Sequence, residues 1–174
     1  MRGVSSVRIR RAVAGDVSRI RSLLRKAFDE YKSSYTPAAY AATTPSEEEI
    51  AERVAEGTVW VALSESLIVG TVSAISRGPE LYIRSMAVLP AARGRKIGEV
   101  LLAHSEEVAD GLGCERMTLS TTPFLYRAIR LYENQGFRRA AEGPRELFGT
   151  PLFTMTKPVG KLPLAARGFD DEVE

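Results

Sequence analysis

The chain has 174 residues, 24 basic and 22 acidic side chains, a net charge of +2 and 44% hydrophobic residues. These values are typical of one globular domain with a sizeable core, and the balanced charge does not favour a nucleic-acid-binding protein. One cysteine excludes an internal disulfide, and one cysteine with one histidine supplies too few ligands to favour a structural zinc site. The apolar stretch at 67–75 is too short to span a bilayer, so no membrane contact is expected. We expect a cytoplasmic protein with no nucleic-acid partner.

The first third of the chain is predicted to hold a strand and two helices. Residues 7–10 alternate apolar and charged side chains, which favours a short strand. A helix is predicted to begin at Asp16, whose carboxylate can cap its free N–H groups. Residues 32–45 are predicted to be a loop. After it, Ser46 and Glu49 have the spacing of a capping box, which predicts the start of the second helix.

The middle of the chain is predicted to hold three strands and a helix. Residues 58–75 have two apolar runs around a turn near Glu65, which predicts a pair of strands buried on both faces. A third strand is predicted at 80–89 and is closed by Pro90. The helix that follows has apolar side chains at helical spacing from Ile97 onward.

The last third is predicted to hold a strand at 116–120, a further helix, and two short strands within 146–157. Thr122 can cap the helix, with Pro123 favourable at its first position. From Pro158 onward the chain has several helix breakers and little periodicity, so we expect a domain at 1–159 and a mobile tail at 160–174.

The segment "AARGRKIGEVLL" at 91–102 places basic residues and two glycines before a helix. A helix N-terminus leaves N–H groups without intrahelical partners, and its dipole attracts anions. The spacing is neither that of a Walker A loop nor that of a dinucleotide-binding fingerprint. Taken alone, the segment is equally compatible with a phosphate site and with a solvated basic helix start.

A second segment, "RAIRLYENQGF" at 127–137, is a predicted helix that ends in Gly-Phe. Together, the two segments at this spacing resemble the GCN5-related N-acetyltransferase (GNAT) superfamily. The resemblance covers about 7–159 and is strongest at 81–137. It implies a mixed α/β fold, with a twisted, mostly antiparallel sheet flanked by helices.

The resemblance also implies acetyl-CoA as cosubstrate, bound between the strands at 81–88 and 116–120, and no metal. The residues that it assigns to the cosubstrate are Met86, Ala87 and Val88 on a splayed strand, Arg93, Gly94, Arg95, Lys96, Ile97 and Gly98 around the pyrophosphate, and Leu125, Ala128 and Tyr132 on the next helix. Two positions depart from the family pattern. Lys96 replaces a glycine, and Leu125 replaces an asparagine that contacts pantetheine in many members.

By the same resemblance, Tyr132 is a catalytic candidate, because a phenol can protonate the departing CoA thiolate. Without that context it is a core aromatic residue. Glu80 is a candidate base for the attacking amine, directly or through water, and the alternative is a solvated turn glutamate. The implied reaction is direct acetyl transfer to a primary amine. The tyrosines of the predicted loop at 32–45 and the modest size of the chain favour a small-molecule acceptor. A protein or peptide amine and a CoA-binding sensor without turnover stay open, as does a homodimer.

Overall fold

The computed structural model describes residues 6–160. Its strands are β1 (Val7–Arg11), β2 (Val59–Ser64), β3 (Leu67–Arg77), β4 (Glu80–Val88), β5 (Arg116–Thr121), β6 (Arg138–Ala140), β7 (Glu146–Leu147), β8 (Thr150–Pro151) and β9 (Phe153–Pro158). Its α-helices are α1 (Val17–Phe28), α2 (Pro37–Thr43), α3 (Glu47–Ala55), α4 (Ile97–Gly111) and α5 (Tyr126–Asn134). The 3-10 turns are η1 (Ala14–Asp16), η2 (Asp29–Ser34) and η3 (Pro90–Ala92).

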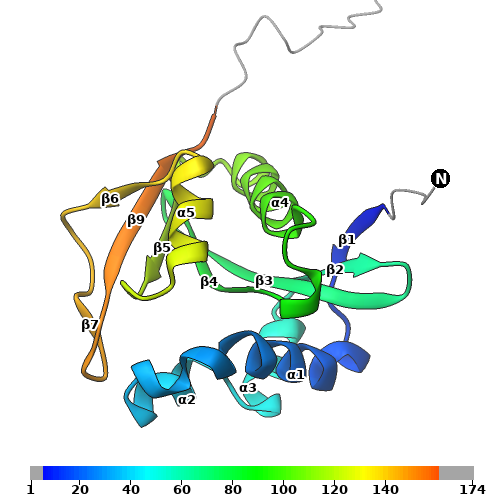
Figure 1. Ribbon diagram of the computed structural model, residues 1–174. Coiled ribbons are helices and arrows are strands. Elements are labelled where there is room, and N and C mark those ends of the chain that lie inside the picture. Colours follow the sequence, from blue (N-terminus) through cyan, green and yellow to red (C-terminus); the bar gives the residue numbers. More distant parts are fainter. Residues whose placement is uncertain (1–5, 161–174) are drawn as a thin grey trace, which may run out of the picture.

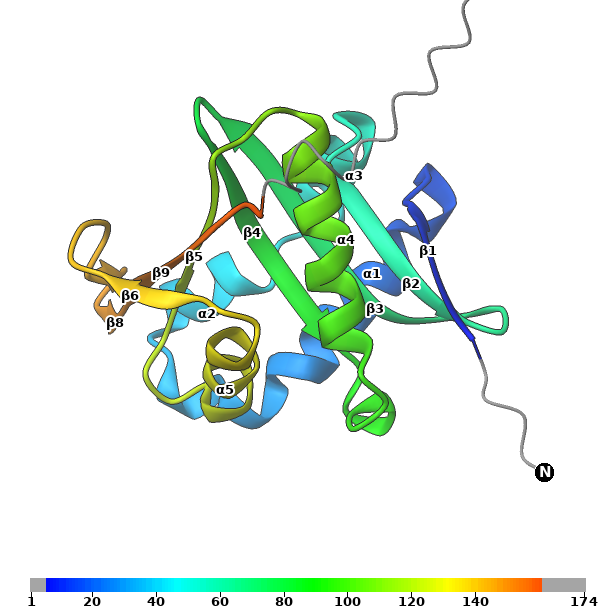
Figure 2. The ribbon, with the colours of Figure 1, turned by 90° about the horizontal axis from the view of Figure 1, so that it is seen from above.

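Seven strands form one sheet in the order β1-β2-β3-β4-β5-β9-β6, and β7 pairs with β8 in a separate ribbon. All neighbours in the large sheet are antiparallel except β4 and β5, which are parallel. The expected mixed α/β class with a mostly antiparallel sheet is therefore confirmed. Helix α4 lies on one face of the sheet with α5 beside it, and α1, α2 and α3 lie on the other side (Figures 1 and 2).

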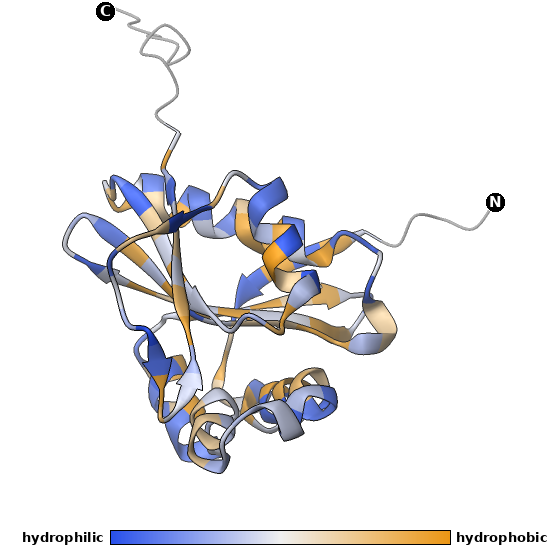
Figure 3. Cartoon of the chain, turned by 60° about the vertical axis from the view of Figure 1, so that its left-hand side comes forward, coloured by the Kyte–Doolittle hydropathy of each residue, from blue (hydrophilic) through white to orange (hydrophobic). Residues whose placement is uncertain are grey.

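Two apolar clusters fill the spaces between the sheet and its helices. One joins α4 and α5 to the sheet and includes Leu101, Met117 and Phe137, and the other joins α1 and α3 to the opposite face and includes Leu23 and Val61. Figure 3 shows the apolar segments running along the central strands and the inward sides of the helices. Burial on both faces explains the near-continuous apolar runs of the central strands.

The predicted capping box is confirmed. The Ser46 hydroxyl accepts a hydrogen bond from the N–H of Glu49, and the Glu49 carboxylate accepts one from the N–H of Ser46. The loop predicted at 32–45 is wrong, because most of it is η2 and α2. Thr36 caps α2 by accepting from the N–H of Ala39, with Pro37 at the first helical position.

The start predicted for the helix after β5 is also wrong. The helix α5 begins at Tyr126, with Leu125 at the N-cap. Thr122 instead closes a turn by accepting at its carbonyl from the N–H of Leu125. The tail predicted at 160–174 lies, apart from Gly160, outside the described residues. Within the described part of the chain, no helix is long and apolar enough to cross a membrane.

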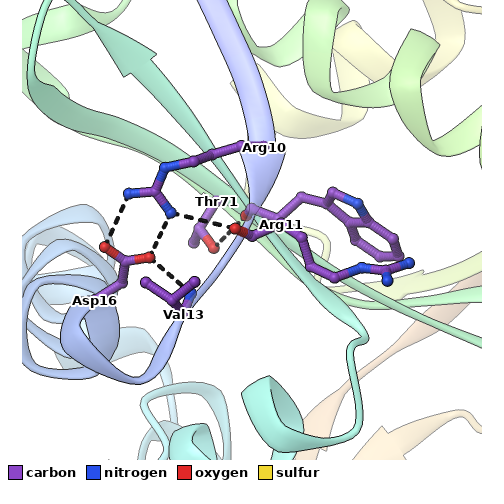
Figure 4. Close-up of polar contacts among 6 residues, drawn as sticks. Arg10, Arg11, Val13, Asp16 and Thr71 are labelled. Atoms are coloured by element: carbon purple, nitrogen blue, oxygen red, sulfur yellow. Dashed lines mark hydrogen bonds and ion pairs between the residues drawn. The ribbon is translucent and has the colours of Figure 1, made fainter.

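Asp16 joins β1 to the segment that leads into α1 (Figure 4). The helix begins one residue later than predicted, and the Asp16 carboxylate does not cap it. It accepts two hydrogen bonds from the Arg10 guanidinium, at 2.6 and 3.1 Å, and one from the N–H of Val13 at 2.8 Å. The Arg10 hydrogen bonds hold the pKa of the buried Asp16 carboxyl below its usual value.

We predict that Asp16→Asn lowers the free energy of unfolding at pH 7 by about 1–2 kcal/mol, because a charge-assisted pair is lost and Arg10 is half-exposed. A lowered pKa stabilises the fold above the unfolded-state value of about 3.9, and this stabilisation is lost as the pH falls through the native value. Urea titrations at pH 7 and pH 3 measure this. Equal wild-type and variant stabilities at pH 7 would contradict the prediction.

Gly70 on β3 determines how closely α4 approaches the sheet. A Cβ atom at this position would lie 2.9 Å from Cγ2 of Ile97 and 3.0 Å from Cδ1 of Leu101. The first turns of α4 therefore rest directly on the β3 backbone. This contact places the N-terminus of α4 beside the end of β4.

Candidate functional site

The two parallel strands of the sheet separate along their length. β4 pairs with β5 only from Glu80 to Ile83, opposite Arg116 to Leu119. The register of β4 against β3 shifts between Ile83 and Ser85, so Arg84 is a bulged residue. Beyond the bulge, β4 continues to Val88, and no strand of residues 6–160 pairs with its β5 side.

The backbone beyond the bulge faces the gap with unpaired groups. The N–H of Leu89 donates to the carbonyl of Val69, and antiparallel pairing alternates, so the N–H groups of Met86 and Val88 point away from β3 into the gap. On β5, the N–H of Val159 donates to the carbonyl of Glu115, so the backbone groups of Glu115 face β9. By the same alternation, the backbone N–H and carbonyl of Ser120 face the gap.

A cavity of about 630 Å³ includes this gap, a volume typical of small-molecule sites. Its walls come from the second half of β4, the end of β5, the segment before α4, and the helices α1, α3 and α5. Of the predicted cosubstrate residues, those that line it are Met86, Ala87, Val88, Arg93, Gly94, Lys96, Ile97, Gly98, Leu125, Ala128 and Tyr132. The fold thus brings together residues that are far apart in the sequence.

A row of free amides lies at one end of the cavity. The first helical bond of α4 runs from the N–H of Val100 to the carbonyl of Lys96 at 3.2 Å. Among the described residues, none accepts a hydrogen bond from the six N–H groups of residues 94–99. Six adjacent donors at the positive end of a 15-residue helix form a site suited to an anion.

The backbone of this loop bends twice into the left-handed region. Gly94 has φ 82° and Lys96 has φ 61° and ψ 25°. Lys96 therefore adopts a conformation that costs a residue with a Cβ atom about 1–2 kcal/mol more than it costs a glycine. Its amide still belongs to the free row, and its exposed side chain adds a positive charge at the cavity.

We predict that Lys96→Gly raises the free energy of unfolding by about 0.5–1 kcal/mol, the relief of the left-handed strain less the added entropy of the unfolded chain. Lys96→Ala is the control, because it removes the charge but keeps the strain. Urea denaturation of the two variants measures the difference. A glycine variant no more stable than the alanine variant would disprove the strain.

Two arginines share one carboxylate at the rim of the cavity. The guanidinium groups of Arg93 and Arg127 lie 2.5 and 3.6 Å from the same oxygen of Glu30. Both arginines line the cavity, so two positive charges from different elements converge there. Arg95, in contrast, does not line it. Its side chain donates to the Ser64 hydroxyl at 2.7 Å and ties the loop to the end of β2.

Tyr132 lies in the inner wall of the cavity, beside the gap between the strands. Its ring packs against Phe137 at 5.8 Å, and burial raises the pKa of its phenol to about 12, with a smaller contribution from the nearby Tyr35. The phenol is therefore a protonated donor at any ordinary pH. A thiolate leaving in the same desolvated place would also have a raised pKa, which offsets part of the mismatch between the two groups.

Glu80 is the one predicted catalytic residue that the structure does not bring to the cavity. Its Oε1 accepts a hydrogen bond from Nε of Arg116 at 2.8 Å, at the paired end of β4 and β5. Its position and ion pair agree with the alternative given for Glu80, a turn glutamate without a catalytic role. Carboxylates that do line the cavity are those of Glu99, in the first turn of α4, and Glu146, on β7.

Several lining residues were not predicted from the sequence. Arg53 of α3 and the bulged Arg84 are basic, and Tyr82 is aromatic. Nothing local marks Arg53, because its role depends on the packing of α3 near β4. Arg84 stands out only as a charge inside an apolar strand, a signal that could have predicted an inward-facing polar group. Within residues 6–160, no cluster of three or more His, Cys, Asp or Glu side chains could hold a metal ion.

Comparisons with known proteins agree with this geometry. The model of the Acetyltransferase (GNAT) family matches residues 19–137. An uncharacterized N-acetyltransferase, YjgM of Escherichia coli, is 42% identical over 55 residues, which are 32% of this chain and 33% of that protein. An aminoalkylphosphonate N-acetyltransferase of Salmonella typhimurium is 41% identical over 58 residues, 33% of this chain and 38% of that protein. The matched stretch thus spans about a third of the first relative and 38% of the second.

Among solved structures, the PaiA N-acetyltransferase of Thermoplasma acidophilum in complex with coenzyme A superimposes with a TM-score of 0.77. The alignment covers 88% of this chain and 99% of that one at 16% sequence identity. At this identity the likeness concerns the fold.

Proposed function

Because this chain belongs to the GNAT family of acetyltransferases, we propose that it transfers the acetyl group of acetyl-CoA directly to a primary amine, most readily that of a small molecule. The observation that supports this best is the row of six free amides at residues 94–99, which leads into the gap between β4 and β5. A pyrophosphate on the amides and a pantetheine arm in the gap would follow one continuous path.

The residues fit this cosubstrate at both ends of the path. The free amides and the side chains of Lys96, Arg93 and Arg127 suit a pyrophosphate. The N–H groups of Met86 and Val88 suit the amide carbonyls of an extended arm, which would add to β4 as a strand would. Leu125 and Ala128 line the opposite wall and offer an apolar surface.

In the proposed reaction, the neutral amine attacks the thioester carbonyl and forms a carbon–nitrogen bond. The tetrahedral intermediate then breaks its carbon–sulfur bond and releases CoA thiolate. The Tyr132 phenol donates a proton to that sulfur, and the protonated nitrogen of the intermediate loses one proton to water. Water returns a proton to the Tyr132 phenolate, so the products are a neutral amide and CoA thiol. Glu80 has no part in this proposal, since its carboxylate is paired with Arg116 outside the cavity.

The walls at the acceptor end of the cavity favour a small-molecule acceptor. These walls come from Tyr35 before α2, Tyr82 on β4 and Leu147 on β7, so side chains surround the gap on several sides. The relative named as an aminoalkylphosphonate N-acetyltransferase acts, by that name, on a small amine. A protein or peptide amine is the second acceptor class. A CoA-binding sensor is the alternative of another kind, and Leu125, which lacks the family's polar contact, is the observation in its favour.

We predict that the double substitution Arg93→Ala with Lys96→Ala raises the dissociation constant of acetyl-CoA about tenfold or more, because two positive charges beside the pyrophosphate are lost. Isothermal titration calorimetry measures the affinity. The matched control is Arg25→Ala with Lys26→Ala, which removes two exposed charges from α1 away from the cavity. Unaltered affinity in the first variant would mean that the pyrophosphate lies elsewhere.

We predict that Tyr132→Phe lowers kcat about 100-fold and leaves the affinity for acetyl-CoA nearly unchanged, because the ring stays and only the proton donor is lost. Release of free thiol from acetyl-CoA with a panel of amines measures this. In the wild type, kcat should rise with pH as the amine deprotonates and show no decline up to pH 10, since the Tyr132 pKa is about 12.

The same assay separates the alternatives. Binding of acetyl-CoA without thiol release on any amine would support the sensor and overturn the transferase. Thiol release that is unchanged in Tyr132→Phe would overturn the role of Tyr132 and leave the transferase in place.

A further inference from the structure

Two arginines lie at the end of the cavity opposite the free amides. Arg84 is the bulged residue of β4, and Arg53 is in the last turn of α3. Val88, at the amide end of the same strand, is four residues from Arg84, which is about 13 Å along an extended strand. The two basic groups therefore belong to the acceptor end of the cavity and are separate from the charges around the pyrophosphate.

Arg84 is held in place and still has a free donor group. Its Nε and Nη2 donate to the Ser73 hydroxyl at 3.2 and 3.1 Å, and Nη2 also donates to the Thr58 hydroxyl at 2.9 Å and lies 3.5 Å from Glu56. Its Nη1 has no partner among the described residues. The bulge thus fixes the guanidinium and leaves one edge unbound.

Arg53 lacks an ion pair although it is half-buried. No carboxylate of the described chain lies within 4 Å of its guanidinium. Burial and the nearby positive charge of Arg84 lower its pKa. Two guanidinium groups that line the same partly desolvated cavity are stabilised by an anion that contacts both.

The acidic groups near the pair are already engaged or exposed. The Glu49 carboxylate accepts from the N–H of Ser46 in the capping box, and Glu56 has a half-exposed side chain at 3.5 Å from Arg84. Both raise the pKa of Arg53, but neither lines the cavity. On the cavity side, Glu146 is the carboxylate of the acceptor end, and it is exposed on β7.

We infer that the acceptor is a short primary amine that carries a phosphonate, phosphate or carboxylate, with the anionic group bound between Arg53 and Nη1 of Arg84. This inference rests on the proposed acetyl transfer. Met86, whose N–H faces the gap, lies two residues or about 7 Å along β4 from Arg84. An amine a few bonds from the anionic group would then reach the thioester. Planar guanidinium groups suit both oxyanion types, and the walls formed by Tyr35, Tyr82 and Leu147 reduce competition from water.

The experiment compares matched acceptors and matched variants. The acceptors are 2-aminoethylphosphonate and β-alanine, whose second group is anionic, ethanolamine, whose second group is uncharged, and 1,3-diaminopropane, whose second group is cationic. Each is followed by thiol release from acetyl-CoA. The variants are Arg53→Gln and Arg53→Lys, because Arg84 also holds Ser73 and Thr58 and its removal could disturb the fold. Arg25→Gln removes an exposed charge from α1 and is the control.

We expect kcat/KM for at least one anionic acceptor to exceed that for ethanolamine by tenfold or more. The preference should fall at least tenfold in Arg53→Gln, recover in part in Arg53→Lys and persist in Arg25→Gln. The ratio of phosphonate to carboxylate turnover identifies which oxyanion the site takes. Equal or better turnover of ethanolamine or the diamine, or a preference that survives Arg53→Gln, would overturn the inference and leave acetyl transfer intact.

Absence of turnover on every amine would instead overturn the proposed function, and a second measurement then decides the anion site. Ethylphosphonate and propionate, which have no amine, are titrated into CoA-saturated protein by calorimetry. Binding that weakens at least tenfold in Arg53→Gln and not in Arg25→Gln supports the site. No binding to the wild type, or equal binding to both variants, overturns it.

Discussion

The short parallel ladder between β4 and β5 is the constraint on which the cavity depends. Four residue pairs join the strands, from Glu80 with Arg116 to Ile83 with Leu119, and the bulge at Arg84 ends the pairing. A β-strand has donors on both edges, and β4 beyond the bulge has a neighbour on only one. The separation of the strands therefore creates both the space and the unpaired hydrogen-bonding groups that line it.

The bulge at Arg84 affects both the cosubstrate side and the acceptor side of the cavity. On one side of it, the N–H groups of Met86 and Val88 face the gap. At the bulge itself, the Arg84 side chain is anchored by hydroxyls and lines the cavity. A single extra residue in one strand thus changes the direction of a side chain and frees a strand edge, as bulges near functional sites commonly do.

Prediction from the sequence succeeded where the signal is local. The capping box at Ser46, the strands of the central apolar runs and the helix after Lys96 depend on neighbours within a few residues, and the structure has them. It failed where a local signal had a competitor. Thr36 and Pro37 begin the helix α2 inside the segment predicted to be a loop, at 32–45. The tyrosines of this segment and Pro45 favoured a loop over a short helix. Asp16 had a stronger partner in Arg10 than in the helix that it precedes.

The candidate site divides in the same way. The amide loop at 93–98 and Tyr132 belong to continuous segments whose spacing could be compared with a family. The placement of Arg53 and Arg84 on one cavity, the ion pair of Glu80 with Arg116 and the hydrogen bond of Arg95 to Ser64 all bring together residues more than 30 positions apart. Such contacts exist only after the sheet has formed, so no pattern in the sequence indicates them.

Gly70 affects how accurately the free amides of residues 94–99 are positioned. The missing side chain lets Ile97 and Leu101 rest on the β3 backbone, so the height of α4 above the sheet is set by a steric stop and not by a flexible contact. Hydrogen bonds weaken sharply when donor and acceptor separate by more than a few tenths of an ångström beyond about 3 Å. A helix raised by one methyl group would carry all its free amides away from a bound anion together. Gly70 lies away from the proposed substrates, yet it determines how precisely all the free amides at the start of α4 are positioned.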